Sequence, residues 1–115
     1  MSYLIQDAVA RYRVAYGICR ADDWERFIEV LGIRCFEDDL PANIPAVIGD
    51  NIIIIQRGMT HDSKARRVWH ELSHWFLHVG DRDWWMRRPQ GHITVARFER
   101  QANEFAASFP IWDGD

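Results

Sequence analysis

Two histidines and a glutamate stand close together in the segment VWHELSHWFLH, residues 68–78. His70 and His74 are four residues apart, so on a helix they are neighbours on one face. Two imidazoles at this spacing can both reach one zinc ion at about 2.0–2.1 Å. Glu71 lies too far round the helix to join them, but its carboxylate can take a proton from water and return it to a leaving amine. The motif is therefore typical of a zinc-dependent peptidase, with a solvated polar helix face as the alternative interpretation.

The helix that holds this motif is expected to begin at Asp62 or Ser63, either of which can act as the N-cap, and to run to about Val79. At about 100° per residue, the two histidines lie within about 40° of each other, opposite the main apolar stripe. They are therefore not part of the buried face. The residues of the expected apolar stripe are Ala65, Val68, Trp69, Leu72, Trp75, Phe76 and Val79.

A catalytic zinc site needs a third protein ligand and one open position. His78 follows His74 by four residues, but it lies about 12 Å along the helix axis from His70, so one ion cannot bind all three. We expect His78 to support the site or to be structural. Glu99 is the better candidate when it is considered together with the two histidines, although alone it would be a solvated helix residue. Asn103 follows one turn later on the same side and is placed to orient a ligand.

The elements that must position these residues indicate an α+β fold with a small three-stranded antiparallel sheet. The sheet is expected from residues 33–37, 45–49 and 51–56, the last two forming a hairpin that turns on Gly49 and Asp50. The run NIIIIQ fits either an edge strand that binds extended substrate or a plain core strand. The expected helices cover about 3–16, 22–31, 62–79 and 94–109, with Asp22 as N-cap of the second, Gly17 and Gly32 ending the first two, and a loop over 81–92.

Length and composition indicate one domain, residues 1–115, with 48% apolar residues, which excludes wholesale disorder. No apolar run is long enough to cross a membrane, and the N-terminus does not have the pattern of a signal peptide. Cys19 and Cys35 form neither a metal-binding pair nor a disulfide framework. These features predict a cytoplasmic protein with no membrane association.

The charge distribution argues against direct binding of nucleic acid. The formal net charge of the chain is −3. Residues 1–56 contain five basic and nine acidic side chains, whereas residues 57–100 contain nine basic and five acidic ones. A general nucleic-acid binder would usually be basic over the whole domain. A local basic face that contacts a partner remains open, as does an ordinary solvated surface.

The segments HELSH and, further on, ERQANEFA together resemble the ImmA/IrrE family of metallopeptidases. Members of this family have the patterns H-E-x-x-H and E-x-x-A-N-x-F-A, and the resemblance covers roughly residues 25–110. It implies a gluzincin-like zinc site with His70, His74 and Glu99 as ligands, Glu71 as general base and Asn103 beside them. It also implies a substrate class, because known members cleave helix-turn-helix repressors and thereby relieve repression.

Some features depart from the family pattern or lie outside it. Ser73 replaces a small Gly or Ala, and Trp69 stands where a small residue is common, although its expected orientation is toward the core. The chain ends soon after the last helix, which suggests a minimal peptidase domain. A donor for the oxyanion is also needed, and His92 is the first candidate, followed by Tyr12 or Tyr16.

The sequence therefore leads to two hypotheses from different classes. The first is a zinc-dependent endopeptidase that cleaves one protein, a DNA-binding transcriptional repressor. The second is an antirepressor-like binding module that sequesters a regulator without cutting it and retains a structural or vestigial zinc site. Two histidines and one carboxylate also suit manganese or iron, so the donor set alone does not identify the ion.

Overall fold

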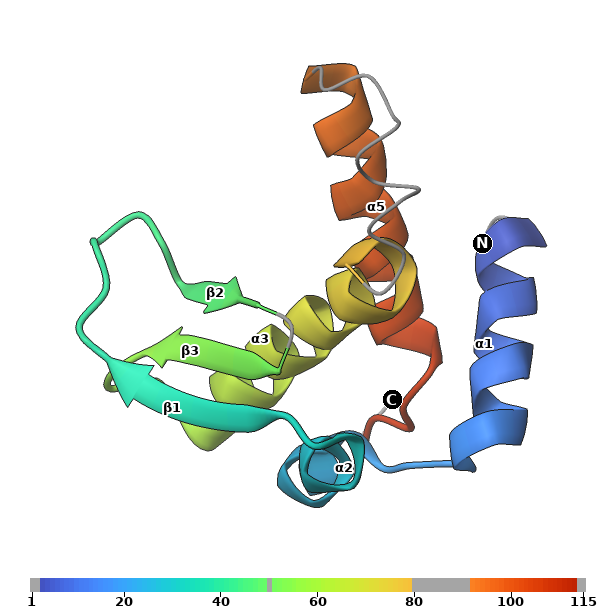
Figure 1. Ribbon diagram of the computed structural model, residues 1–115, viewed down its shortest axis with the longest axis horizontal. Helices are drawn as coiled ribbons and strands as arrows, with labels where there is room; N and C mark the ends of the chain where they lie inside the picture. Colours follow the sequence, from blue (N-terminus) through green and yellow to red (C-terminus); the bar gives the residue numbers. More distant parts are fainter. Residues whose placement is uncertain (1–2, 50, 80–91, 114–115) are drawn as a thin grey trace.

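The computed structural model describes residues 3–49, 51–79 and 92–113, and for 78, 79 and 92–95 the backbone alone. The expected α+β class is confirmed, with helices around one three-stranded sheet (Figure 1). Most of the loop expected over 81–92 lies outside the described residues. In chain order the elements are α1 (Tyr3–Tyr16), the 3₁₀ turn η1 (Ala21–Asp23), α2 (Trp24–Leu31), β1 (Arg34–Asp38), β2 (Ala46–Ile48), β3 (Ile52–Gln56), α3 (His61–His74), the π-helical turn η2 (Trp75–Val79) and α5 (His92–Ser108).

The sheet has the strand order β1-β3-β2, so that β3 is the central strand. β2 and β3 are antiparallel, as the expected hairpin requires. β1 is parallel to β3, with Arg34 opposite Ile52 and Asp38 opposite Gln56. The prediction of an entirely antiparallel sheet is therefore wrong for this pair. The cause is strand order, because β3 inserts between two consecutive strands of opposite direction and must run parallel to one of them.

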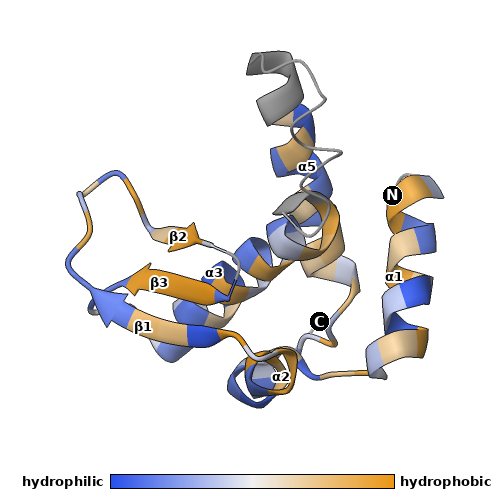
Figure 2. Ribbon diagram, viewed as in Figure 1, coloured by the Kyte–Doolittle hydropathy of each residue, from blue (hydrophilic) through white to orange (hydrophobic). Residues whose placement is uncertain are grey.

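The central position of β3 follows from its composition. Its four consecutive isoleucines are β-branched, and such residues favour strands. Ile53 and Ile55 are 0% and 1% exposed, while the alternate positions are only partly buried. Figure 2 shows β3 as the most uniformly hydrophobic strand of the three. The core-strand interpretation of NIIIIQ is therefore confirmed, and the edge-strand interpretation is wrong.

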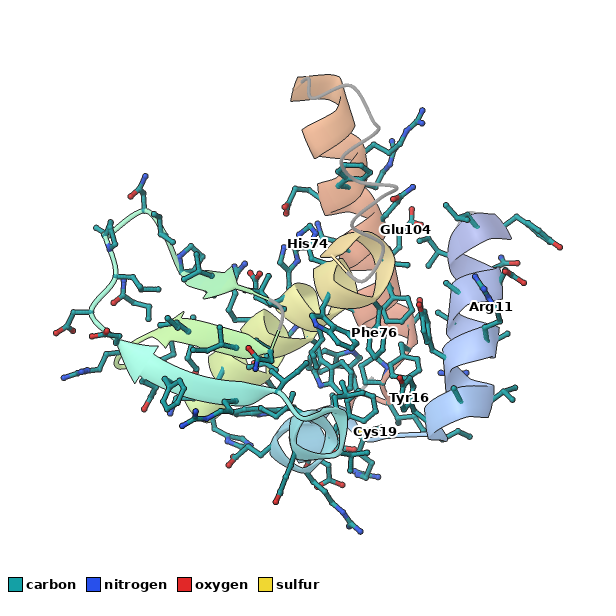
Figure 3. All side chains as sticks on the ribbon, in the orientation of Figure 1. Arg11, Tyr16, Cys19, His74, Phe76 and Glu104 are labelled. Atoms are coloured by element: carbon teal, nitrogen blue, oxygen red, sulfur yellow. The ribbon has the colours of Figure 1, made fainter. Side chains whose placement is uncertain are left out.

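α3 packs between the sheet and α5, which fixes the helix that holds the motif (Figure 1). The described residues of its expected apolar stripe are buried, apart from the partly buried Trp75, with Val68, Trp69 and Leu72 at 0% exposure. The sequence also predicts an apolar stripe at Phe98, Ala102, Phe105 and Phe109, on α5 and directly after it, and these residues are buried. Aromatic rings fill the space between these helices and α1, with Tyr16 and Phe76 among them (Figure 3). The rings in mutual contact include Phe27, Trp69, Phe76, Phe105 and Phe109.

Helix ends differ from expectation in detail. The N-cap of α3 is Thr60, whose hydroxyl accepts a hydrogen bond from the Ser63 backbone N–H at 3.2 Å, rather than Asp62 or Ser63. Asp22 lies inside η1, so it is not the N-cap of α2. Gly32 ends α2 as predicted, with a φ of 75° that favours glycine. The last residues of the expected helix to Val79 form the π-helical turn η2, in which α-helical hydrogen bonding is widened.

Two further predictions from the sequence concern the cysteines and membrane-spanning helices. Cys19 and Cys35 are both free thiols. None of the helices in the described part of the chain is sufficiently long and apolar to span a membrane.

The N-terminal helix is tied to the end of α5 by Arg13. Its guanidinium donates to the backbone carbonyls of Ser108 at 2.7 Å and Phe109 at 3.2 Å. We expect Arg13→Ala to lower the free energy of unfolding by about 1–2 kcal/mol, because the half-buried carbonyls would lose the charged group that donates hydrogen bonds to them. Arg11→Ala is the matched control, since Arg11 is exposed and pairs only loosely with Asp7 at 3.6 Å. Equal losses of unfolding free energy for the two variants in urea titrations would contradict the role of Arg13 in tying α1 to the end of α5.

Candidate metal centre

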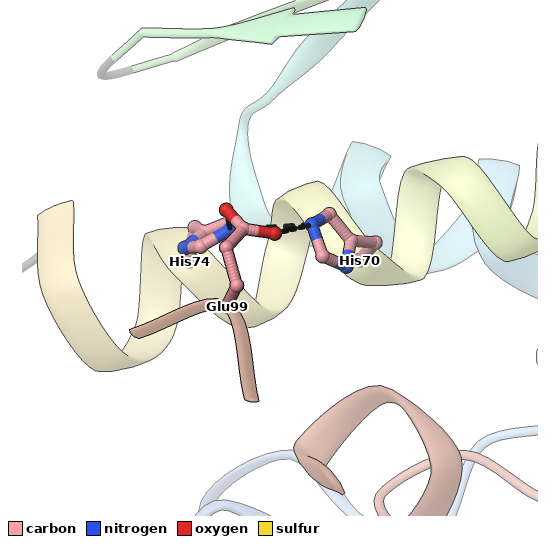
Figure 4. A group of neighbouring side chains, drawn as sticks. All are labelled: His70, His74 and Glu99. Carbon is pink, nitrogen blue, oxygen red and sulfur yellow. Dashed lines mark hydrogen bonds and ion pairs between the residues drawn. The ribbon is translucent and has the colours of Figure 1, made fainter. Parts of the chain in front are cut away.

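Three side chains from two helices converge on one point beside α3 (Figure 4). The Nε2 atoms of His70 and His74 lie 3.2 Å apart. The carboxylate of Glu99, on α5, places one oxygen 3.0 Å from His70 Nε2 and the other 2.9 Å from His74 Nε2. Residues far apart in the sequence therefore bring three atoms that could bind a metal ion to a common centre.

Asn103 fixes the orientation of the first histidine. Its side-chain oxygen lies 2.9 Å from His70 Nδ1. An amide oxygen only accepts hydrogen bonds, so Nδ1 must carry the hydrogen and Nε2 of a neutral ring must carry a lone pair. That lone pair is directed toward the carboxylate of Glu99. A metal-binding histidine usually donates its other ring N–H to a hydrogen-bond acceptor, and the amide oxygen of Asn103 takes that place here.

The geometry fits a small divalent cation. Ligand atoms bound tetrahedrally at about 2.0–2.1 Å from zinc lie about 3.3 Å from one another. The Nε2 atoms of the two histidines are 3.2 Å apart, and each lies 2.9 or 3.0 Å from a different oxygen of Glu99, so these contacts are close to this value. Neutral imidazole nitrogens and a carboxylate would otherwise bring lone pairs against one another, so the group needs a cation or protons between its members. Three protein ligands would also leave a fourth position open, as in catalytic zinc sites.

Glu71 lies beside this group and is almost completely buried, at 8% exposure. Burial raises the pKa of Glu71, and the nearby His70 and Arg67 partly oppose that rise. Nη1 of Arg67 is 3.8 Å from the Glu71 carboxylate. A carboxylate with a raised pKa accepts a proton more readily, which suits a general base. The sequence placed Glu71 at the edge of a polar face, whereas the fold covers it.

The supporting residues predicted from sequence have different outcomes. His78 is within η2 and His92 is the first residue of α5, but their side chains lie outside what the structure describes. Tyr12 is not directed to the centre, because its hydroxyl donates to the carbonyl of Phe76 at 3.2 Å and its ring packs in the core. It is therefore not a donor for the oxyanion in this arrangement.

Sequence reasoning missed the groove that adjoins the centre. This groove has a volume of about 680 Å³ and includes Arg66, Arg67 and Trp112 in its lining, together with His70 and Glu99. One signal was available, because Arg66 and Arg67 precede His70 by four and three residues and so occupy the neighbouring turn. The contribution of Trp112 could not be anticipated, since it depends on how the C-terminal segment folds back over α5.

Comparison with known proteins agrees with this site. The family model Peptidase_M78, described as the IrrE N-terminal-like domain, matches residues 28–113. The match includes both histidines, Glu71, Glu99 and Asn103. Searches of curated proteins and of solved structures gave no match. On the basis of the family model, this chain belongs to the Peptidase_M78 family of IrrE N-terminal-like domains, a family of metallopeptidases.

Proposed function

We propose that this protein is a zinc-dependent endopeptidase that cleaves a DNA-binding, helix-turn-helix transcriptional repressor in the cytoplasm. The observation that supports it best is the convergence of His70, His74 and Glu99, whose ligand atoms lie within 4.8 Å of one another, with a buried carboxylate alongside. The family supports peptidase activity. The repressor as substrate comes from the resemblance to ImmA/IrrE members.

The chemistry is assigned to five side chains. His70, His74 and Glu99 would hold the ion, and Asn103 would keep His70 in its binding tautomer. A bound zinc ion would polarise the scissile carbonyl and make an attacking water molecule more acidic. Glu71 accepts the proton of that water as the C–O bond forms, and donates a proton to the amine nitrogen as the C–N bond breaks. Its burial keeps the carboxylate basic enough for the first of these steps.

The direct test is incubation of the zinc-loaded protein with helix-turn-helix repressors encoded beside it. Intact-mass measurement should find two fragments whose masses together equal the repressor plus one water. A repressor that binds tightly and stays whole would overturn the peptidase proposal and favour the antirepressor-like module. A chelator should stop cleavage, and added zinc should restore it.

The role of Asn103 can be tested separately from catalysis. Asn103→Ala should weaken zinc binding by about tenfold to a hundredfold, because the His70 ring loses the partner that orients it. Asn103→Asp keeps an oxygen acceptor and should retain most of the affinity. Competition with a chromophoric chelator measures both. Wild-type affinity in Asn103→Ala would show that the hydrogen bond to His70 does not support the site.

A further inference from the structure

The groove beside the metal centre has a basic wall that the reaction itself does not use. Its wall on α3 includes Arg66 and Arg67, and its wall on α5 includes the small residues Ala106 and Ala107. Both arginines are one helical turn before His70, which is about 5.4 Å along the helix axis. An extended peptide advances about 3.3 Å per residue, so the turn that holds both arginines is offset from His70 by the length of about two residues of peptide.

Arg66 is held in place from two sides. Its Nε donates to the carboxylate of Asp62 at 2.9 Å, and its guanidinium lies 5.3 Å from the ring centroid of Trp112. Trp112 is itself anchored, because its indole N–H donates to the carbonyl of Ala106 at 2.9 Å. A guanidinium that is already oriented loses less side-chain conformational freedom when it donates hydrogen bonds to a carboxylate of the substrate.

Arg67 lies deeper in the same groove. Its side chain is 31% exposed, against 69% for that of Arg66, and its ion-pair contact within the described part of the chain is with the buried Glu71, at 3.8 Å. That separation is too long for a direct hydrogen bond, so the guanidinium keeps donors for a second carboxylate. Arg67 thus faces both the general base and the space where substrate would lie.

The charge of the groove is positive once the centre is assigned to a metal. Of its described lining residues, Glu99 is the only one with a carboxylate, and that group is a proposed metal ligand. The acidic partners of the two guanidiniums, Asp62 at 2.9 Å from Arg66 and Glu71 at 3.8 Å from Arg67, lie outside the lining, so the surface of the groove itself carries the positive charge. A guanidinium binds a carboxylate through paired, charge-assisted hydrogen bonds, which a neutral amide of the same shape cannot match.

From these contacts we infer that the groove is a specificity subsite for an acidic side chain of the substrate, an Asp or Glu within about two residues of the scissile bond. This inference rests on the proposed function, because it concerns substrate bound across the same centre. Arg66 and Arg67 are its specificity-determining residues, and Trp112 is a positioning residue that acts through Arg66.

The first arm of the test measures cleavage. C-terminally amidated peptides that scan Glu against Gln at each position around the cut are incubated with the zinc-loaded protein, so that only side-chain carboxylates differ. We expect about tenfold higher kcat/KM for Glu at one position, as a charge-assisted contact gives. Arg66→Gln and Arg67→Gln should each reduce that ratio strongly. Arg34→Gln should keep it, because Arg34 also lies over an aromatic ring, that of Phe36 at 5.1 Å, but does not line the groove.

The second arm measures binding and does not depend on turnover. The zinc-loaded Glu71→Gln variant is titrated with the same Glu and Gln peptides, alone and combined with Arg66→Gln. About tenfold tighter binding of the Glu peptide, lost in the combined variant, supports the subsite even if no peptide is cut. Equal binding of the two peptides overturns it. Cleavage without an acidic preference also overturns the subsite while the peptidase function stands, so the two failures are distinguishable.

Discussion

Glu71→Gln is expected to reduce peptide cleavage by about a thousandfold while leaving the zinc content unchanged. Glutamine has nearly the same shape, so the buried side chain, 8% exposed, can be replaced without opening a cavity. The amide cannot accept the proton of the attacking water, and the variant therefore loses the step that forms the C–O bond. Neither His70 nor His74 is altered, so the ligand set is preserved.

The measurement is kcat/KM together with metal analysis of the same preparation. Glu29→Gln, at an exposed position on α2, is the control and should retain wild-type activity. Cleavage that survives in Glu71→Gln would show that another group acts as the base. Loss of metal in the variant would instead show that Glu71 is needed to keep the metal site intact.

Trp69→Ala should cause the largest loss of stability of any single substitution proposed for this chain, about 3–5 kcal/mol. Trp69 is completely buried, lies 5.2 Å from Phe27 and 5.9 Å from Phe109 between ring centroids, and donates from its indole to the carbonyl of Ala21 at 2.8 Å. Truncation leaves a cavity and an unpaired carbonyl. Because Trp69 directly precedes His70, zinc binding should weaken as well.

Urea unfolding in the presence of a chelator measures this effect without stabilisation by bound metal. Trp69→Phe keeps a ring in the core and should lose less than Trp69→Ala. Trp75→Ala is a second comparison, since Trp75 is only partly buried at the start of η2. A loss below about 1 kcal/mol for Trp69→Ala would contradict the role of this residue in holding α3.

Local patterns predicted the parts of the fold that depend on one helix or one strand at a time. The apolar stripes of α3 and α5 follow a period of 3.6 residues, and every described member that was expected to face the core is at least partly buried. The hairpin of β2 and β3 was also predictable, because the two strands are consecutive in the chain and are joined by a short turn. The parallel pairing of β1 with β3 could not be anticipated, because strand order depends on contacts between distant segments.

The site was predictable in a similar, partial way. The spacing of His70 and His74 indicates two candidate ligands, whereas Glu99 became the third candidate only when it was considered together with them, because helical position alone would leave it a solvated residue. The contact of Asn103 with His70 depends on how α5 crosses α3. The burial of Glu71 also arises from tertiary packing, and a helical wheel places it only at the edge of the polar face.

The most direct test of the account is the zinc content per chain of protein purified without added metal, compared between the natural sequence and Glu99→Ala. The geometry of His70, His74 and Glu99 predicts close to one zinc per chain, with most of it lost in the variant. Circular dichroism should show that both proteins are folded. Little metal in either folded protein, or undiminished zinc in Glu99→Ala, would contradict a three-ligand centre.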